Sequence, residues 1–195
     1  MSKFYILNGP AGSGKDTIAH YITEHDKSFA QLEFKAGLYE ATSTRYGVDK
    51  SWFKRIAVDR ILKETPFSLL GNVSPREAMI ETSEKYIKPE FGDAFFGKAL
   101  AATAEKITYQ NHITNFVISD GGFVGEALAL VEAGHEVHVI HLRNPRFSFE
   151  GDSRDYVVVP GAFLHTIEVV YGDPESGYLQ FLKILSNYKG CFHAH

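Results

Sequence analysis

A glycine-rich stretch near the N-terminus constrains this chain more than any other feature. It reads GPAGSGKDT over residues 9–17, follows the short apolar run FYILN and precedes the helical pattern TIAHYI. The spacing G-x-x-x-x-G-K is typical of a phosphate-binding loop (P-loop), in which backbone N–H groups surround phosphate oxygens and a lysine adds positive charge. The stretch predicts a nucleotide-binding loop between a buried strand and a helix. The alternative is a glycine-rich turn that binds no nucleotide.

The residue after the loop lysine departs from the general pattern. There the motif has Ser or Thr, whose hydroxyl binds the magnesium ion of the nucleotide, whereas this chain has Asp16 followed by Thr17. A carboxylate can meet magnesium directly or through water, because this ion prefers oxygen ligands and usually keeps several waters. Alternatively, Asp16 simply caps the helix. The sequence leaves both roles open.

Length, charge and cysteine content limit the kinds of protein this chain can be. With 195 residues, of which 44% are hydrophobic and 23% charged, it suits a single globular domain spanning residues 1–195. A net charge of −4 provides no basic field for a nucleic acid polymer. Cys191 is the single cysteine, so an internal disulfide is excluded. We see no signal peptide or membrane span and expect no membrane partner and a cytoplasmic location, in the host cytoplasm if the chain is phage-encoded.

Short apolar runs predict a sheet that is buried on both faces, as in α/β proteins. We expect an α/β P-loop NTPase fold with a mainly parallel five-stranded sheet and helices on both faces. The predicted strands lie near residues 4–8, 30–34, 115–119, 137–142 and 167–170.

The segment from about residue 36 to 110 reads as mainly helical and is too long for a plain crossover. We interpret it as an insertion over the carboxyl edge of the sheet, where open α/β folds bind ligands. Within it, Ser74 and Glu77 have the spacing of a capping box around Pro75. Arg76 then lies in the first turn of a helix, where it could hold a phosphate. A solvated charged face is the alternative.

Two further stretches carry charge near the expected ligand crevice. Asp120 ends the predicted strand at residues 115–119, where an acidic residue of a P-loop protein usually orients magnesium; it could also cap the next helix, at about residues 124–133. The polar segment at about residues 143–156 contains Arg143, Arg146 and Arg154. It reads either as an arginine-bearing lid that neutralises charge and excludes water, or as a surface loop with Asp–Arg pairs.

Four motifs in this order resemble those of bacteriophage deoxynucleoside monophosphate kinases, which belong to the P-loop nucleoside and nucleotide kinases. They are GPAGSGKDT, SPREAMIETSEKYIKPEFG, VISDGGFVGEA and the arginine loop ending in GDSRDY. Aspartate after the P-loop lysine is the form such kinases show. The chain departs from them at Gly121, Gly122 and Phe123, where related sequences often carry an arginine.

The resemblance implies ATP and Mg²⁺ as cofactors and small nucleotides as substrates, and it is compatible with a homodimer. It places Lys15, Arg143, Arg146 and Arg154 on the transferred phosphate, and Asp16 and Asp120 on magnesium. It makes Lys35, Arg45, Arg76 and Glu77 the residues for the acceptor monophosphate. Cofactor contacts are implied for Gly9, Ala11, Gly12, Ser13, Gly14, Lys15, Asp16 and Thr17.

The predicted activity is transfer of a phosphate from ATP to a deoxynucleoside 5′-monophosphate. A P-loop kinase for another small acceptor is an alternative within enzymes. A nucleotide-gated binding module, in which loops order and disorder as a switch, is an alternative from another class. The sequence does not reveal the preferred base.

Overall fold

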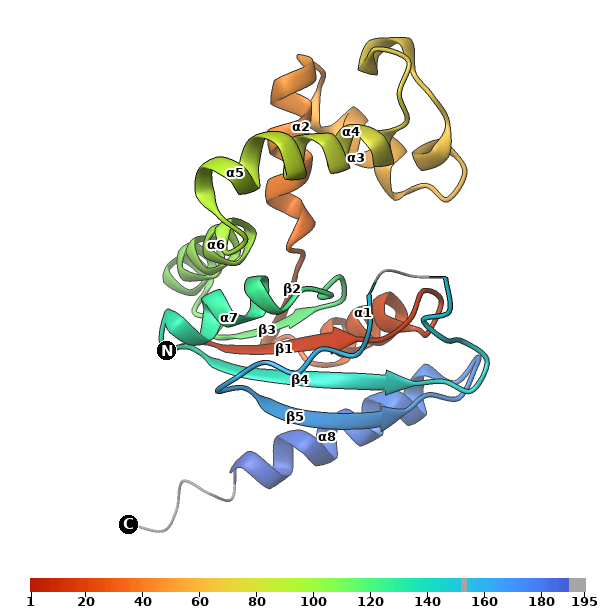
Figure 1. Cartoon of the computed structure of the whole chain (residues 1–195). Coiled ribbons are helices and arrows are strands. Elements are labelled where there is room, and N and C mark those ends of the chain that lie inside the picture. Colours follow the sequence, from red (N-terminus) through yellow and green to blue (C-terminus); the bar gives the residue numbers. More distant parts are fainter. Residues whose placement is uncertain (152–153, 190–195) are drawn as a thin grey trace.

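The computed structural model describes residues 1–151 and 154–189 and contains a parallel sheet of five strands in the order β2-β3-β1-β4-β5 (Figure 1). Every pairing between neighbouring strands is parallel. The predicted α/β fold, with the P-loop between the first strand and the first helix, is confirmed. The strands are β1 (Lys3–Asn8), β2 (Phe29–Leu32), β3 (Asn115–Ile118), β4 (Glu136–Arg143) and β5 (Phe163–Glu168).

The last strand begins four residues before its predicted start. We expected it at residues 167–170, where the sequence is most apolar, but β5 begins at Phe163 and ends at Glu168. It is an edge strand that pairs with β4 alone, so most of its side chains are exposed and its apolar signal is weak.

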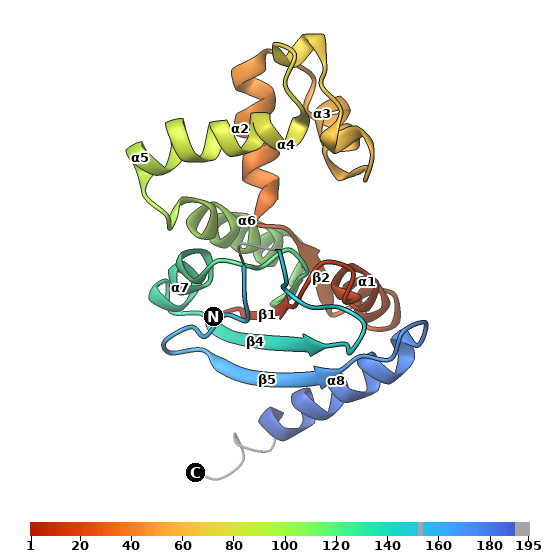
Figure 2. The same ribbon diagram turned by 45° about the vertical axis from the view of Figure 1, so that its right-hand side comes forward.

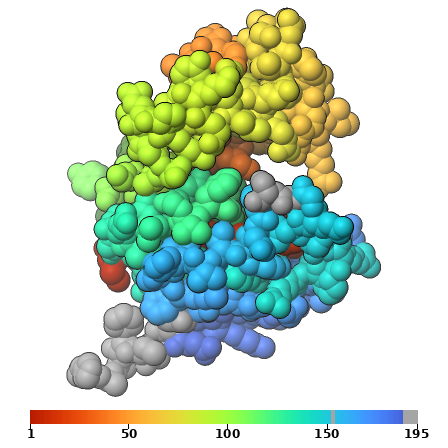
Figure 3. Space-filling view, in the orientation of Figure 1, coloured from red at the N-terminus to blue at the C-terminus, as the bar shows by residue number. Residues whose placement is uncertain are grey.

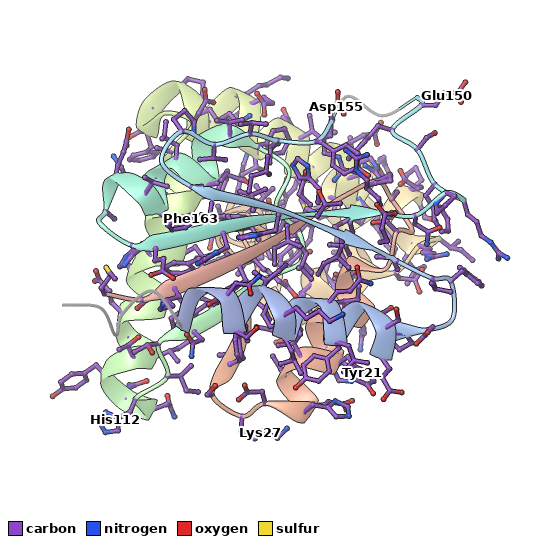
Figure 4. All side chains as sticks on the ribbon, turned by 90° about the horizontal axis from the view of Figure 1, so that it is seen from below. Tyr21, Lys27, His112, Glu150, Asp155 and Phe163 are labelled. Atoms are coloured by element: carbon purple, nitrogen blue, oxygen red, sulfur yellow. The ribbon has the colours of Figure 1, made fainter. Side chains whose placement is uncertain are left out.

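Helices cover both faces of the sheet because alternate residues of the central strand point to opposite sides. Phe4 and Ile6 pack in the core beneath α6 (Phe95–Asn111) and α7 (Val124–Glu132). Tyr5 and Leu7 pack on the other side against α1 (Lys15–His25) and α8 (Pro174–Lys189). Figure 4 shows α1 and α8 on this second face, where the rings of Tyr21 and Tyr178 lie 5.4 Å apart.

The predicted helical insertion divides into two parts. Its last helix, α6, belongs to the layer that covers the sheet. Residues 35–91 form a separate module with its own apolar core, which includes Tyr39, Phe53 and Leu70. Figures 1 and 2 show this module standing on one side of the sheet. Its elements are α2 (Lys35–Tyr46), α3 (Lys50–Val58), the short 3-10 helices η1 (Leu62–Glu64) and η2 (Ser68–Leu70), α4 (Pro75–Glu81), the π-helix η3 (Thr82–Ile87) and α5 (Lys88–Phe91).

The capping box predicted in this module is confirmed at the start of α4. The Ser74 hydroxyl accepts the Glu77 N–H at 3.3 Å, and the Glu77 carboxylate accepts the Ser74 N–H at 2.8 Å. These bonds lower the pKa of Glu77, because backbone and hydroxyl hydrogen bonds from Ser74 favour the charged form. No helix within residues 1–151 and 154–189 is long and apolar enough to cross a membrane.

Candidate active site

The loop between β1 and α1 is built so tightly that glycine is required at its start. A Cβ atom at Gly9 would lie 2.8 Å from Ser13 Oγ and 2.9 Å from the carbonyl oxygen of Leu142. Gly14, with φ 97°, is the N-cap of α1, and L side chains rarely adopt that backbone conformation. The loop therefore sits closely on the carboxyl ends of β1 and β4, next to the first N–H groups of α1, which have no acceptor within the helix itself.

Two polar side chains in this loop suit an anionic ligand. The Ser13 hydroxyl is buried and, in the part of the chain that the structure describes, makes no hydrogen bond. Lys15 Nζ donates to the carbonyl oxygens of Gly9 and Pro10, at 2.7 Å each. Buried polar atoms normally have a partner, so the orphan hydroxyl is explained if a phosphate oxygen completes it. The residues fit the phosphates of a nucleotide.

The remaining predicted P-loop residues line the open side of the loop. Ala11, Gly12, Asp16 and Thr17 are all exposed. A Cβ atom at Gly12 would lie 2.6 Å from Cε1 of Phe147, so the Phe147 ring rests directly against the loop. Sequence analysis missed this contact, because nothing in the local pattern links residues 135 positions apart.

Three carboxylates lie close enough to the phenol of Tyr39, in α2, to affect its ionisation. Burial raises the pKa of Tyr39 most, and the negative charges of Glu33, Asp120 and Asp16 raise it further. Asp16 and Asp120 therefore both lie near Tyr39, although no group of three metal-ligating side chains occurs among the described residues. Two carboxylates fit a magnesium ion that keeps most of its water shell.

Asp120 holds the start of the insertion rather than capping the helix that follows it. Its Oδ1 accepts the Phe34 N–H and its Oδ2 accepts the Lys35 N–H, both at 2.9 Å. Helix α2 receives no cap from its own N-cap side chain, Phe34, so the cap comes from the end of β3. The N-cap of α7 is Phe123, and the expectation that Asp120 caps that helix is wrong. Burial raises the pKa of Asp120, while these N–H groups and Lys35 oppose the shift.

Replacing Asp120 with alanine should loosen the first turn of α2. Loss of an N-cap usually lowers the free energy of unfolding by about 1 kcal/mol, because two helix N–H groups lose their acceptor. We expect faster hydrogen exchange at the amides of Phe34 and Lys35. Asp49→Ala is the matched control, since Asp49 caps α3 through the Trp52 N–H at 2.8 Å. Unchanged exchange at Phe34 and Lys35 in Asp120→Ala would contradict this role.

The structure does not gather the predicted acceptor residues into one cluster. Lys35 and Arg45 lie near the two ends of α2, and ten residues of helix span about 15 Å. Arg76 is exposed and pairs with Glu64 through Nε at 2.7 Å. Glu77 is engaged in its capping box. Their roles toward an acceptor stay predictions, and Lys35 is the one nearest the end of β3.

Arg45 is held by a frame of neighbouring side chains. Its guanidinium lies 3.9 Å from the ring centroid of Tyr86 and 3.2 Å from the Glu81 carboxylate. Tyr46 donates its hydroxyl to the same carboxylate at 2.9 Å. These hydrogen bonds, chiefly that from Arg45, lower the pKa of Glu81 to about 2. Tyr86 belongs to the π-helix η3, a rare geometry that is frequent at functional sites.

The arginine loop reaches from the P-loop to the end of β3. Arg146 lies over the Tyr171 ring, 4.7 Å from its centroid, next to the Phe147 ring that touches Gly12. Arg154 packs on Gly122, where a Cβ atom would lie 3.1 Å from its Cδ. Arg143 is exposed at the end of β4, 5.8 Å from the Tyr156 ring centroid. Residues 152–153 of the predicted lid lie outside the described residues.

A buried asparagine ties this region together, and sequence analysis missed it. Asn8 ends β1, donates through Nδ2 to the Gly121 carbonyl oxygen at 3.3 Å, and accepts the Val157 N–H at 3.0 Å through Oδ1. One side chain thus joins the end of the central strand to the loop after β3 and to the returning end of the arginine loop. A polar residue that closes an apolar strand run is the signal that could have identified it.

Glu126 was also missed. It lies in the first turn of α7, and burial raises its pKa to about 8, helped by the charge of Asp120 and opposed by Lys35 and Lys88. Its neighbours in α7, VGEALALVE, are almost all apolar. An acidic residue within such a run was the sequence signal that could have identified Glu126.

No family model matches the chain, and no curated protein sequence matches it significantly. Among solved structures, TT1252 from Thermus thermophilus is similar in fold, at 13% identity over 95% of this chain and 97% of that one, with a TM-score of 0.50. A sugar kinase from Janibacter sp. HTCC2649 is 13% identical over 95% of both chains, with a TM-score of 0.49. Shikimate kinase from Acinetobacter baumannii is 15% identical over 96% of this chain and 94% of that one, with a TM-score of 0.43. The similarity to TT1252 concerns the fold alone, and we draw no argument from the two kinases, whose TM-scores are below 0.5.

Proposed function

We propose that this chain transfers the γ-phosphate of ATP to a deoxynucleoside 5′-monophosphate, giving ADP and the diphosphate. The observation that carries the proposal is the P-loop, with a lysine in place and a Ser13 hydroxyl that bonds to none of the described residues, beneath an arginine loop that packs on Gly12 and on Gly122. Arginines in a loop next to a phosphate site suit phosphoryl transfer, because charge builds on the transferred group. The acceptor class comes from the sequence motifs alone.

The reaction needs positioning and charge neutralisation more than acid–base chemistry. The attacking oxygen belongs to a phosphate that is already anionic near neutral pH, so no general base is required. Lys15 and the three arginines would supply positive charge to the transferred phosphate, and the loop would exclude water. Magnesium bound with ATP would neutralise further charge, with Asp16 and Asp120 holding its water shell.

The test is release of ADP that depends on the acceptor. The protein is incubated with ATP and magnesium and each of the four common deoxynucleoside monophosphates, alongside sugars and phosphorylated metabolites as competing acceptor classes. We expect ADP release well above the acceptor-free background with at least one deoxynucleotide. Turnover with a sugar only would favour the alternative kinase, and a folded protein that responds to no acceptor would refute the proposal.

A further inference from the structure

Glu126 is a carboxyl group at the junction of the insertion and the sheet. It is partly buried in the first turn of α7. Within residues 1–151 and 154–189, no hydrogen bond and no ion pair reaches its carboxylate. Its oxygens are not among the fully buried side-chain atoms that lack a hydrogen bond in the described residues, so a ligand can reach them.

The usual reasons for a glutamate at this position do not apply. Glu77 occupies the same third position of α4 and closes a capping box with Ser74, which lowers its pKa. Glu126 cannot do so in the same way, because the N-cap of α7 is Phe123, which provides no side-chain hydrogen bond. A carboxylate stabilised by the helix dipole would also have a lowered pKa. Burial instead raises the pKa of Glu126.

An exposed aromatic side chain lies three residues before Glu126, at the N-cap of α7. Phe123 is 55% exposed, although it is a large apolar side chain in the loop that joins the sheet to α7. Lys88, at the start of α5, places its Nζ 5.4 Å from the ring centroid. The charges of Lys35, Lys88 and Asp120 act on Glu126 from α2, α5 and the end of β3. Glu126 and Phe123 thus lie on the floor beneath the insertion.

The backbone under these two residues is held firmly. Gly97 of α6 packs directly against the carbonyl oxygen of Glu126, leaving no room for a side chain. Gly125 packs against Asp93: a Cβ atom added at Gly125 would lie 3.3 Å from the Cβ atom of Asp93. Figure 3 shows the insertion overhanging the body of the protein, with an opening on one side between them. A carboxyl and a ring on a rigid floor are suited to recognising a flat ligand.

We propose that Phe123 and Glu126 form the subsite for the nucleobase of the acceptor, with the ring stacked on the base and the carboxyl hydrogen-bonded to its edge. This inference rests on the proposed function. A protonated carboxyl group offers a donor beside an acceptor, which matches the paired donor and acceptor on the edge of a heterocyclic base. Stacking on an aromatic ring tolerates any base, since every base has a π-face. The ligand class is a nucleoside monophosphate, whose phosphate extends toward the P-loop.

Binding of two ligands that differ only in the base tests the subsite. Calorimetric titration, without ATP, compares deoxynucleoside monophosphates with 2-deoxyribose 5-phosphate, which has no base. We expect Glu126→Ala and Phe123→Ala each to weaken binding of the best deoxynucleotide by about tenfold or more, because a buried hydrogen bond or a stacking contact is lost. Binding of the base-free ligand should change less than about twofold. Glu126→Gln keeps a donor and an acceptor and should stay within about threefold of the wild type.

The controls separate this subsite from a structural role and from the reaction. Glu132→Ala alters an exposed glutamate at the other end of α7 and should change neither affinity. Unchanged deoxynucleotide binding in Glu126→Ala, equal weakening of both ligands, or a glutamine variant as weak as alanine would each overturn the inference. A wild type that binds deoxynucleotides without phosphorylating them would refute the proposed reaction, and the binding comparison would still decide the subsite. A wild type that binds no deoxynucleotide more tightly than the base-free ligand overturns it as well.

Discussion

Lys15→Ala should reduce kcat for acceptor-dependent ADP release by about 100-fold to 1000-fold. Removing one preorganised donor to the charge that develops in a transition state usually lowers the rate by this factor, equivalent to about 3–4 kcal/mol. Lys15 Nζ lies against the P-loop carbonyls of Gly9 and Pro10, where it can turn to a bound phosphate without backbone movement. The measurement is the steady-state rate with saturating ATP and acceptor.

Lys27→Ala is the matched control for this variant. Lys27 also donates to a backbone carbonyl, that of Thr23 at 3.0 Å, but it is exposed beyond the C-terminal end of α1. Lys15→Ala loses a lysine charge and two hydrogen bonds to backbone carbonyls, and Lys27→Ala loses the same charge and one such bond, so only Lys15→Ala should lose activity. A Lys15→Ala protein that keeps more than a tenth of the wild-type rate would contradict a role on the transferred phosphate.

The features predicted correctly from sequence are those that neighbouring residues determine. The run FYILN is buried on both faces of β1, and Ser74, Pro75 and Glu77 form their cap within four consecutive positions. Each depends on apolar periodicity or on a local hydrogen bond. The parallel sheet and its helical layers follow from such runs, because strands buried on both faces need cover on both sides.

Contacts between distant parts of the chain could not be predicted in the same way. Asp120 caps a helix that begins 85 positions earlier, and its local sequence suggested α7 instead. The Phe147 ring rests on Gly12 although most of the helices and strands lie between these two residues in the sequence. Glu126 is an ordinary first-turn acid by sequence, and only its burial and its lack of a partner in the described part of the chain set it apart. Side-chain chemistry at the site thus depended on tertiary packing that sequence patterns do not encode.

Gly97→Ala should lower the free energy of unfolding by about 3 kcal/mol, since overpacking of a well-packed contact usually has a penalty of this size. The added methyl group would overlap the carbonyl oxygen of Glu126 and lie 2.7 Å from Cβ of Ala129, so α6 and α7 must separate. The clash involves backbone atoms of α7, which cannot move aside as a flexible side chain could. Urea denaturation gives the free energy and its slope.

Gly37→Ala shows what the same substitution does where there is room. Gly37 lies in α2, and its added Cβ would be 3.5 Å from Cδ1 of Phe96, an ordinary contact. Alanine there should stabilise the protein by about 0.5–1 kcal/mol, because glycine loses more conformational freedom in a helix. Equal effects of the two substitutions would mean that α6 and α7 are not locked at Gly97. In that case the floor carrying Phe123 and Glu126 would be free to shift, and a fixed base subsite there would lose its structural support.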